Sequence, residues 1–118
     1  MSHTDPIVIV SAVRTPLGGF LGNFKEVTAA QLGAVAIRAA VERAGLQPSD
    51  IGEVIMGCVL QAGQGQAPAR QAALLANLPE QVACSTVNKM CGSGMKALMF
   101  GHDLLHAGSA EVVVAGGM

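Results

Sequence analysis

The chain has 118 residues, a formal net charge of −1, and a composition of 51% hydrophobic, 13% charged and 3% aromatic residues. Typical soluble domains carry about 25% charged residues, so we expect part of this chain's surface to be buried against further protein. The weak charge and scarce aromatic side chains argue against nucleic-acid binding, and no run of about 18 apolar residues predicts a membrane span. Three cysteines without a CxxC pair, and a start without a leader pattern, indicate a reducing, cytoplasmic setting with neither a disulfide framework nor a structural zinc site.

Hydrophobic patterning along the chain alternates between short β-branched runs and longer helical segments. The first run is continuous and predicts a strand buried on both faces. Thr28 and Gln31 have the spacing of a capping box, Gly45 is a typical residue after a helix end, and Pro68 suits the first turn of a helix. In chain order the expected elements are a strand at 6–13, a helix at 28–45, a strand at 53–60, a helix at 68–77, a strand at 82–87, a helix at 95–107 and a strand at 111–115.

This order of elements predicts an α/β fold with right-handed crossover connections. The last helix, which follows Cys91, is apolar nearly all round, and such a helix is normally buried on every side. We therefore expect a mixed β-sheet with a buried central helix after Cys91. That helix would lie between two layers, with more protein on its far side than this chain supplies.

Cys91 is the candidate nucleophile of the sequence. It follows a strand that stops at Asn88 and precedes Gly92, Gly94 and the last helix. Unpaired backbone N–H groups and the positive end of the helix dipole gather at such a turn, where they favour a thiolate and can hold a developing oxyanion. Glycines carry no Cβ, so an acyl group can approach the backbone closely. The alternative interpretation of any cysteine is a small core hydrophobe, which we prefer for Cys58.

A dinucleotide-binding unit and a serine nucleophile are competing hypotheses for the same region. Gly92, Gly94 and Ala97 match the G-x-G-x-x-A fingerprint, but the acid that would hold a ribose, Glu111, falls at the start of the next strand instead of its end. Ser93 lacks the Gly-x-Ser-x-Gly elbow that exposes a serine nucleophile.

A zinc site is the third alternative. His102 and His106 share one helix face and, with Asp103, resemble the H-E-x-x-H pattern. No third ligand can be assigned from the sequence, and two histidines near a helix C-terminus are also favoured by the helix dipole.

Several segments, in order along the chain, resemble signatures of the thiolases of the acetyl-CoA C-acetyltransferase type. The most specific one surrounds the candidate nucleophile and reads Asn88-Lys-Met-Cys91-Gly-Ser93-Gly94-Met-Lys-Ala97. The others are Arg14-Thr15-Pro16 with Gly18-Gly19-Phe20, the loop and helix start from Val59 to Ala72, and the ending Val-Val-Ala-Gly-Gly-Met118. The resemblance covers residues 6–118, so residues 1–118 are expected to be the N-terminal portion of a thiolase N-terminal domain, truncated relative to the family.

The resemblance implies a thiolase-like fold of α-β-α-β-α layers, with the helix after Cys91 in the middle layer. It implies that Cys91 takes the acyl group from an acyl-CoA, with its backbone N–H in an oxyanion hole. A second acetyl-CoA then attacks the acyl-cysteine in a Claisen condensation, and thiolysis by CoA is the reverse. Coenzyme A thioesters are the implied substrates, with no permanently bound cofactor. The implied partners are acyl-CoA, CoA and further copies of the chain, in a homodimer or homotetramer formed through the strand near Cys84–Asn88.

The resemblance also implies catalytic groups that this chain lacks. These are a histidine in a Gly-His-Pro motif, a second cysteine in a Cys-x-Gly motif and an Asn-Glu-Ala-Phe-like segment. His102 and His106 are no substitute, because they lie about 16 Å or more along the helix from Cys91 at 1.5 Å per residue. We expect the 118 residues alone to be inactive and the full protein to be a thiolase. The alternative is a non-catalytic member of the superfamily, an acyl-CoA or lipid carrier or an assembly subunit.

Overall fold

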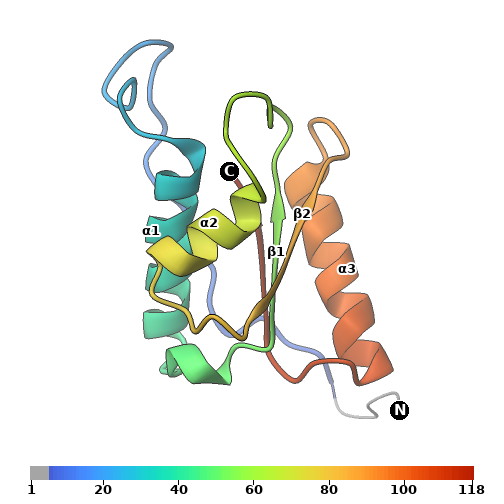
Figure 1. Cartoon of the computed structure of the whole chain (residues 1–118). Coiled ribbons are helices and arrows are strands. Elements are labelled where there is room, and N and C mark those ends of the chain that lie inside the picture. Colours follow the sequence, from blue (N-terminus) through green and yellow to red (C-terminus); the bar gives the residue numbers. More distant parts are fainter. Residues whose placement is uncertain (1–5) are drawn as a thin grey trace.

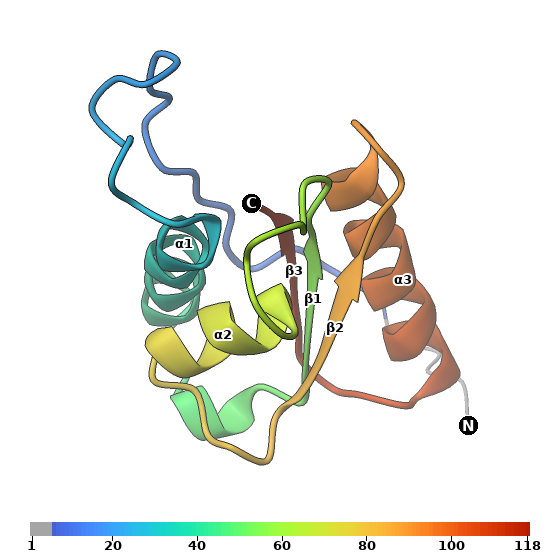
Figure 2. The ribbon, with the colours of Figure 1, turned by 45° about the horizontal axis from the view of Figure 1, so that its top comes forward.

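The computed structural model of the chain describes residues 6–118; residues 1–5, the start of the predicted 1–118 portion, lie outside the described residues. Helices α1 and α2 lie on one face of a three-stranded sheet, and α3 lies on the other (Figures 1 and 2). All strand pairs are parallel, in the order β2-β1-β3. The elements are α1 (Ala29–Arg43), the 3-10 turn η1 (Pro48–Asp50), β1 (Glu53–Gly57), α2 (Pro68–Leu75), β2 (Ala83–Val87), α3 (Ser93–Ala107) and β3 (Val113–Gly117). The predicted α/β class is confirmed.

Helix α1 begins where the capping box was predicted. The Gln31 backbone N–H donates to Thr28 Oγ1 (3.1 Å), and the Thr28 backbone N–H donates to Gln31 Oε1 (2.8 Å). These two bonds satisfy donors that a helix start otherwise leaves unpaired. Gly45, with a φ of +71°, follows the helix end in the left-handed conformation that glycine adopts most easily. Among residues 6–118, no helix is both long and apolar enough to cross a bilayer.

The core lies between the sheet and the α1–α2 pair. Ile37 and Val41 of α1 pack in one buried cluster with Val54 and Met56 of β1. Helix α2 contributes mainly alanines to this cluster, and small side chains let it lie close to both α1 and the sheet. The core is therefore built from aliphatic and small residues, as the scarcity of aromatics requires.

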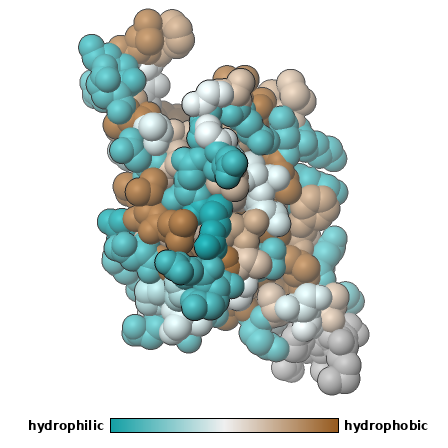
Figure 3. Space-filling view, in the orientation of Figure 1, coloured by the Kyte–Doolittle hydropathy of each residue, from teal (hydrophilic) through white to brown (hydrophobic). Residues whose placement is uncertain are grey.

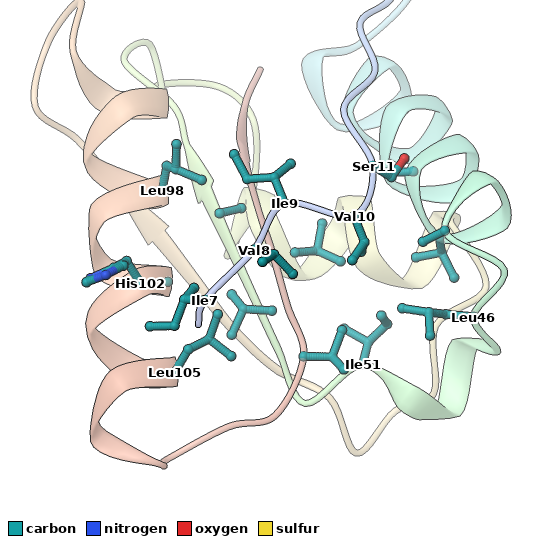
Figure 4. Close-up of a pocket in the computed structure, with 18 of the residues that line it drawn as sticks. Ile7, Val8, Ile9, Val10, Ser11, Leu46, Ile51, Leu98, His102 and Leu105 are labelled. Carbon is teal, nitrogen blue, oxygen red and sulfur yellow. The ribbon is translucent and has the colours of Figure 1, made fainter. Parts of the chain in front are cut away.

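The segment 6–13 does not form the predicted buried strand. No backbone hydrogen bond among residues 6–118 involves it, and its side chains Val8, Ile9 and Val10 are 67%, 72% and 65% exposed. It runs extended past β3, and a cavity of about 490 Å³ is lined by this segment together with α1, α3 and β3 (Figure 4). A strand exists only where a neighbour completes its hydrogen-bond ladder, and no ladder joins this segment to β3. The predicted mixed sheet is therefore wrong for the described residues, whose sheet is all parallel.

Helix α3 is buried on one face only. Its buried residues, Ser93, Ala97 and Gly101, are spaced four apart and point at the sheet. Met95, Leu98 and Met99 are 65%, 45% and 52% exposed. The expected burial on every side is not met within this chain, because the chain supplies a packing layer on only one side of the helix.

A loop at residues 14–27 projects beyond the layers at one end of the molecule (Figure 1). Hydrophobic surface is seen at its tip in the space-filling view (Figure 3). Leu17, Phe20 and Leu21 of this loop are among the most exposed apolar residues of the described chain. Together with the outer face of α3, this loop carries much of the chain's exposed apolar surface, as the composition led us to expect.

Candidate active site around Cys91

Cys91 lies in a five-residue turn, residues 88–92, that joins β2 to α3. We call this segment the Cys91 turn. Gly57 of β1 is in register with Val87 of β2 and with Gly117 of β3, so all three strands end at one edge of the sheet. The turn follows β2 at that carboxyl edge, as predicted. Parallel α/β sheets place their ligands outside the carboxyl ends of the strands.

Cys91 is the exposed cysteine of the three. Cys58 is 1% exposed, which confirms the interpretation of a core residue, and Cys84 is half-buried. The thiols of Cys58 and Cys84 contact Gln64 Nε2 and the Val82 carbonyl oxygen at 3.6 Å and 3.5 Å. The Cys91 thiol has no hydrogen-bond partner among residues 6–118, so it is available to a substrate.

The half-buried position of Cys84 makes its thiol harder to ionise. Desolvation raises the pKa of Cys84, and the nearby Arg70 guanidinium lowers it only in part. Arg70 is itself held in place, because its Nη1 donates to the carbonyl oxygens of Glu80 (2.8 Å) and Val82 (3.1 Å). Cys84 is thus a poor nucleophile at neutral pH, since only the thiolate reacts.

The Cys91 turn is fixed by hydrogen bonds from two polar side chains. Asn88 Oδ1 accepts from the Met90 backbone N–H (2.9 Å), and Asn88 Nδ2 donates to the Val59 carbonyl oxygen (3.2 Å). Ser93 Oγ accepts from the Lys89 backbone N–H (2.8 Å) and donates to the Met90 carbonyl oxygen. Met90 sits between these contacts with a φ of +49°, in the left-handed region that non-glycine residues rarely adopt.

Three glycines bring the start of α3 directly against the sheet edge. A Cβ built on Gly57 would lie 2.4 Å from the Ser93 carbonyl carbon and 2.6 Å from the Gly94 nitrogen. A Cβ on Gly117 would lie 3.2 Å from the Gly94 Cα. Only residues without a side chain allow this backbone-to-backbone approach. The first turn of α3, and with it Cys91, is therefore seated on the ends of β1 and β3.

The start of α3 offers unpaired donors three and four residues after Cys91 in the chain. The backbone N–H groups of Gly94 and Met95 donate no hydrogen bond within the described part of the chain. Helix α3 is 15 residues long, so its dipole adds a partial positive charge at this end. Such a site can stabilise negative charge that develops on a nearby carbonyl oxygen. This arrangement suits a cysteine that accepts an acyl group.

The competing hypotheses lose support from the geometry. Ser93 is 3% exposed and its hydroxyl is engaged in the turn, so it is a poor serine nucleophile. Glu111 precedes β3 and so lies at the opposite edge of the sheet from the Gly92 and Gly94 backbone, where it cannot hold a ribose beside them.

The zinc pattern does not assemble either. His102 and His106 stack with ring centroids 6.1 Å apart, and His102 lines the cavity beside the segment 7–11, far along α3 from Cys91 (Figure 4). Within residues 6–118, no group of three or more histidine, cysteine, aspartate or glutamate side chains could hold a metal ion.

Sequence reasoning identified Cys91 but missed the residues that support it. Asn88 was noted as the end of a strand and part of a motif, Ser93 as part of that motif and as an alternative nucleophile, and Gly57 only as part of a strand. An asparagine two residues before a turn position is a signal that could have been used, because its side chain commonly bonds the backbone two residues on. No local signal exists for Gly57, whose contacts are with residues 36 and 37 positions later.

The chain is similar over nearly all its length to acetyl-CoA acetyltransferases. It is 53% identical to the cytosolic enzyme of Gibberella zeae over 117 residues, which are 99% of this chain and 30% of that protein. It is 57% identical to the enzyme of Cupriavidus necator over 111 residues, which are 94% of this chain and 28% of that protein. The chain thus spans about 30% of the length of these relatives.

A solved structure gives the same picture for the fold. The thiolase from Ascaris suum in complex with coenzyme A superposes with a TM-score of 0.91 at 41% identity, covering 92% of this chain and 28% of the thiolase chain. The family model of the thiolase N-terminal domain matches residues 7–118. With the match covering almost every residue and the fold agreeing, this chain belongs to the thiolase family.

Proposed function

We propose that the protein transfers acyl groups between acyl-CoA and a CoA-bound acceptor, through a covalent acyl-cysteine on Cys91. In the condensation direction two acetyl-CoA molecules give acetoacetyl-CoA and CoA. The observation that carries this proposal is the exposed Cys91 thiol in the turn that leads directly into α3, whose first amides are unpaired. The acetyl-CoA acetyltransferase names of the relatives and the coenzyme A in the structural neighbour support the choice of substrate class.

The chemistry divides into two steps. In the first, the Cys91 thiolate attacks the thioester carbonyl, a C–S bond forms, and the bond to the CoA sulfur breaks; the CoA thiolate takes a proton and leaves. In the second, acetyl-CoA that has lost a proton from its methyl group attacks the acyl-cysteine, which forms the C–C bond and restores the Cys91 thiolate. Both steps pass through an oxyanion, for which the Cys91 backbone N–H and the amides of α3 are the donors nearest at hand in this chain.

The groups that move protons are not among these 118 residues. The histidine and the second cysteine that the family resemblance implies lie in motifs that this sequence does not contain. We therefore propose that residues 1–118 are the nucleophile-bearing portion of an N-terminal domain and are inactive alone. The activity would then belong to the full-length protein, to which this chain contributes the acyl-accepting thiol.

A homo-oligomer formed through β2 is the proposed assembly. β2 is an edge strand of the described sheet, and an unpaired edge is a template for pairing with another chain. Sedimentation of the full-length protein should give a dimer or tetramer, and a monomer at all concentrations would contradict this part of the proposal. The cytoplasmic setting stays a prediction, because the matched relatives include both cytosolic and mitochondrial enzymes.

Trapping the acyl group tests the central claim. Full-length protein is mixed with acetyl-CoA, quenched in acid, and digested for mass spectrometry, with Cys91→Ser and Cys84→Ser as matched variants. The acetyl group should appear on the Cys91 peptide in the native protein and in Cys84→Ser, and should be lost in Cys91→Ser together with acyl transfer. Acetylation at another residue, or none in an active enzyme, would refute the role of Cys91. CoA binding without any acetylation or turnover would favour the non-catalytic carrier instead.

A further inference from the structure

Met90 is held in an unfavourable backbone conformation at the residue before the nucleophile. Its φ of +49° is in the left-handed region, and its side chain is 67% exposed, so packing of the side chain does not enforce this conformation. Left-handed non-glycine residues persist when surrounding contacts determine them, and they concentrate at functional sites. The contacts that hold Met90 must therefore come from its own backbone groups.

Asn88 and Ser93 engage both of those groups. The Met90 N–H donates to Asn88 Oδ1 at 2.9 Å, and the Met90 carbonyl oxygen accepts from both the hydroxyl and the backbone N–H (3.1 Å) of Ser93. We define Asn88 and Ser93 as the Met90 clamp. One member precedes Met90 by two residues and the other follows it by three, so the clamp closes on the turn from both sides.

The clamp is anchored at both ends. Asn88 Nδ2 donates to the carbonyl oxygen of Val59 (3.2 Å), which follows β1 at the same sheet edge. Ser93 opens α3, is 3% exposed, and also accepts from the Lys89 N–H (2.8 Å). It is the one buried polar residue in the described part of the chain, and such a group is normally fully hydrogen-bonded. The turn is thus fixed to the sheet on one side and to the helix on the other.

Cys91 itself has no side-chain bond to fix it. Its position follows from the backbone of Met90 before it and of Gly92 after it. We propose that Asn88 and Ser93 are positioning residues, which hold Met90 left-handed and thereby place the Cys91 thiol for acyl transfer. This inference rests on the proposed function of Cys91. A displacement of about 1 Å at a reacting group can lower a rate by about 100-fold, so the clamp should act on kcat.

Two measurements on the full-length protein test the clamp, one of them independent of catalysis. The variants are Asn88→Ala, Asn88→Ser and Ser93→Ala, and Ser109→Ala is the matched control, because Ser109 is exposed and its hydroxyl makes no bond within the described residues. Hydrogen exchange by mass spectrometry follows the amides of residues 88–93, with α1 peptides as the internal reference. Steady-state kinetics of acetoacetyl-CoA thiolysis give kcat and KM.

In Asn88→Ala and Ser93→Ala the turn amides should exchange at least about 10-fold faster than in the native protein, while the amides of α1 exchange at an unchanged rate. The kcat of both variants should fall by about 10-fold to 100-fold, and their KM should stay within about twofold of the native value. Asn88→Ser should fall between Asn88→Ala and the native protein, because a serine hydroxyl can still accept, more weakly, from the amide two residues on. It also serves as the milder variant should Asn88→Ala fail to fold.

The outcomes separate this inference from the function on which it rests. Faster exchange with unchanged kcat would overturn the positioning role while leaving Cys91 catalytic. Unchanged exchange of the turn amides in Asn88→Ala and Ser93→Ala would overturn the clamp itself. A rise in KM with unchanged kcat would assign the two residues to substrate binding and would also overturn the inference. Full activity in Cys91→Ser would instead overturn the proposed function, whatever the exchange rates of the turn.

Discussion

Substituting Gly57 by alanine would drive a methyl group into the backbone of α3. The new Cβ would lie 2.4 Å from the carbonyl carbon of Ser93, 2.6 Å from its oxygen and 2.6 Å from the Gly94 nitrogen. Ordinary contacts of a Cβ begin at 3.4 Å. All three atoms belong to the main chain and cannot rotate away, so the first turn of α3 must retreat from β1 by about 1 Å. The Cys91 turn is joined to that helix turn and must move with it.

The displacement has a cost in stability and a larger one in rate. Overpacking of this kind typically destabilises by about 1–3 kcal/mol, and the stiffer unfolded chain of an alanine variant offsets about 0.4–1 kcal/mol of that. We expect a net loss of about 1–2 kcal/mol in the free energy of unfolding. Acyl transfer through Cys91 should fall by up to about 100-fold in kcat, because the nucleophile moves by about 1 Å.

Gly116→Ala provides the control. It lies in the neighbouring strand near the same edge, but its Cβ would meet only the Met56 side chain, at 3.4 Å and 3.5 Å, which is ordinary contact with flexible atoms. Urea denaturation gives the stability of both variants of the full-length protein, and thiolysis of acetoacetyl-CoA gives their kcat. Equal kcat values for Gly57→Ala and Gly116→Ala would refute the argument that the glycine contact seats the nucleophile.

Iodoacetamide at mildly alkaline pH should alkylate the native full-length protein first at exposed Cys91. Cys84 should react more slowly and gain rate only at higher pH, because burial raises the pKa of its thiol. Cys58 is buried and should react only after unfolding. Peptide mass spectrometry gives the order, and equal rates at Cys84 and Cys91 would contradict it. Thr28→Ala should cost about 1 kcal/mol in the free energy of unfolding through loss of the capping box, whereas Thr28→Ser should restore it; urea denaturation measures both.

The features that sequence predicted well depend on neighbours a few residues away. Helix α1 starts at its capping box because Thr28 and Gln31 are three residues apart and bond each other. The strand-to-helix turn at Cys91 was predictable for the same reason: a β-branched run ends, glycines follow, and a helical pattern begins within the next few positions. Local composition decides such boundaries to within a few residues.

The features that sequence did not predict depend on distant partners. Residues 6–13 have the composition of a buried strand, yet composition cannot supply the neighbouring strand whose hydrogen bonds would make them one. The hydrogen bond from Asn88 to Val59 joins residues 29 positions apart, and the close backbone contact between Gly57 and Ser93 joins residues 36 positions apart. Both connect strand ends that meet only because β1 and β2 are parallel and in register. The candidate nucleophile, Cys91, could therefore be proposed from the sequence, whereas the contacts that support its turn could not.

Part of the exposed apolar surface lies on the outer face of α3 and on the neighbouring N-terminal segment. The outer face of α1 carries charged, exposed residues such as Arg38 and Glu42, whereas residues 8–10 and several residues on the outer face of α3 are apolar and exposed. These two apolar surfaces meet around the cavity beside β3 (Figure 4). Any protein layer that covers them would lie along α3, and α3 begins at the Cys91 turn. A protein layer over this surface would remove exposed apolar side chains from water, as the composition of the chain led us to expect.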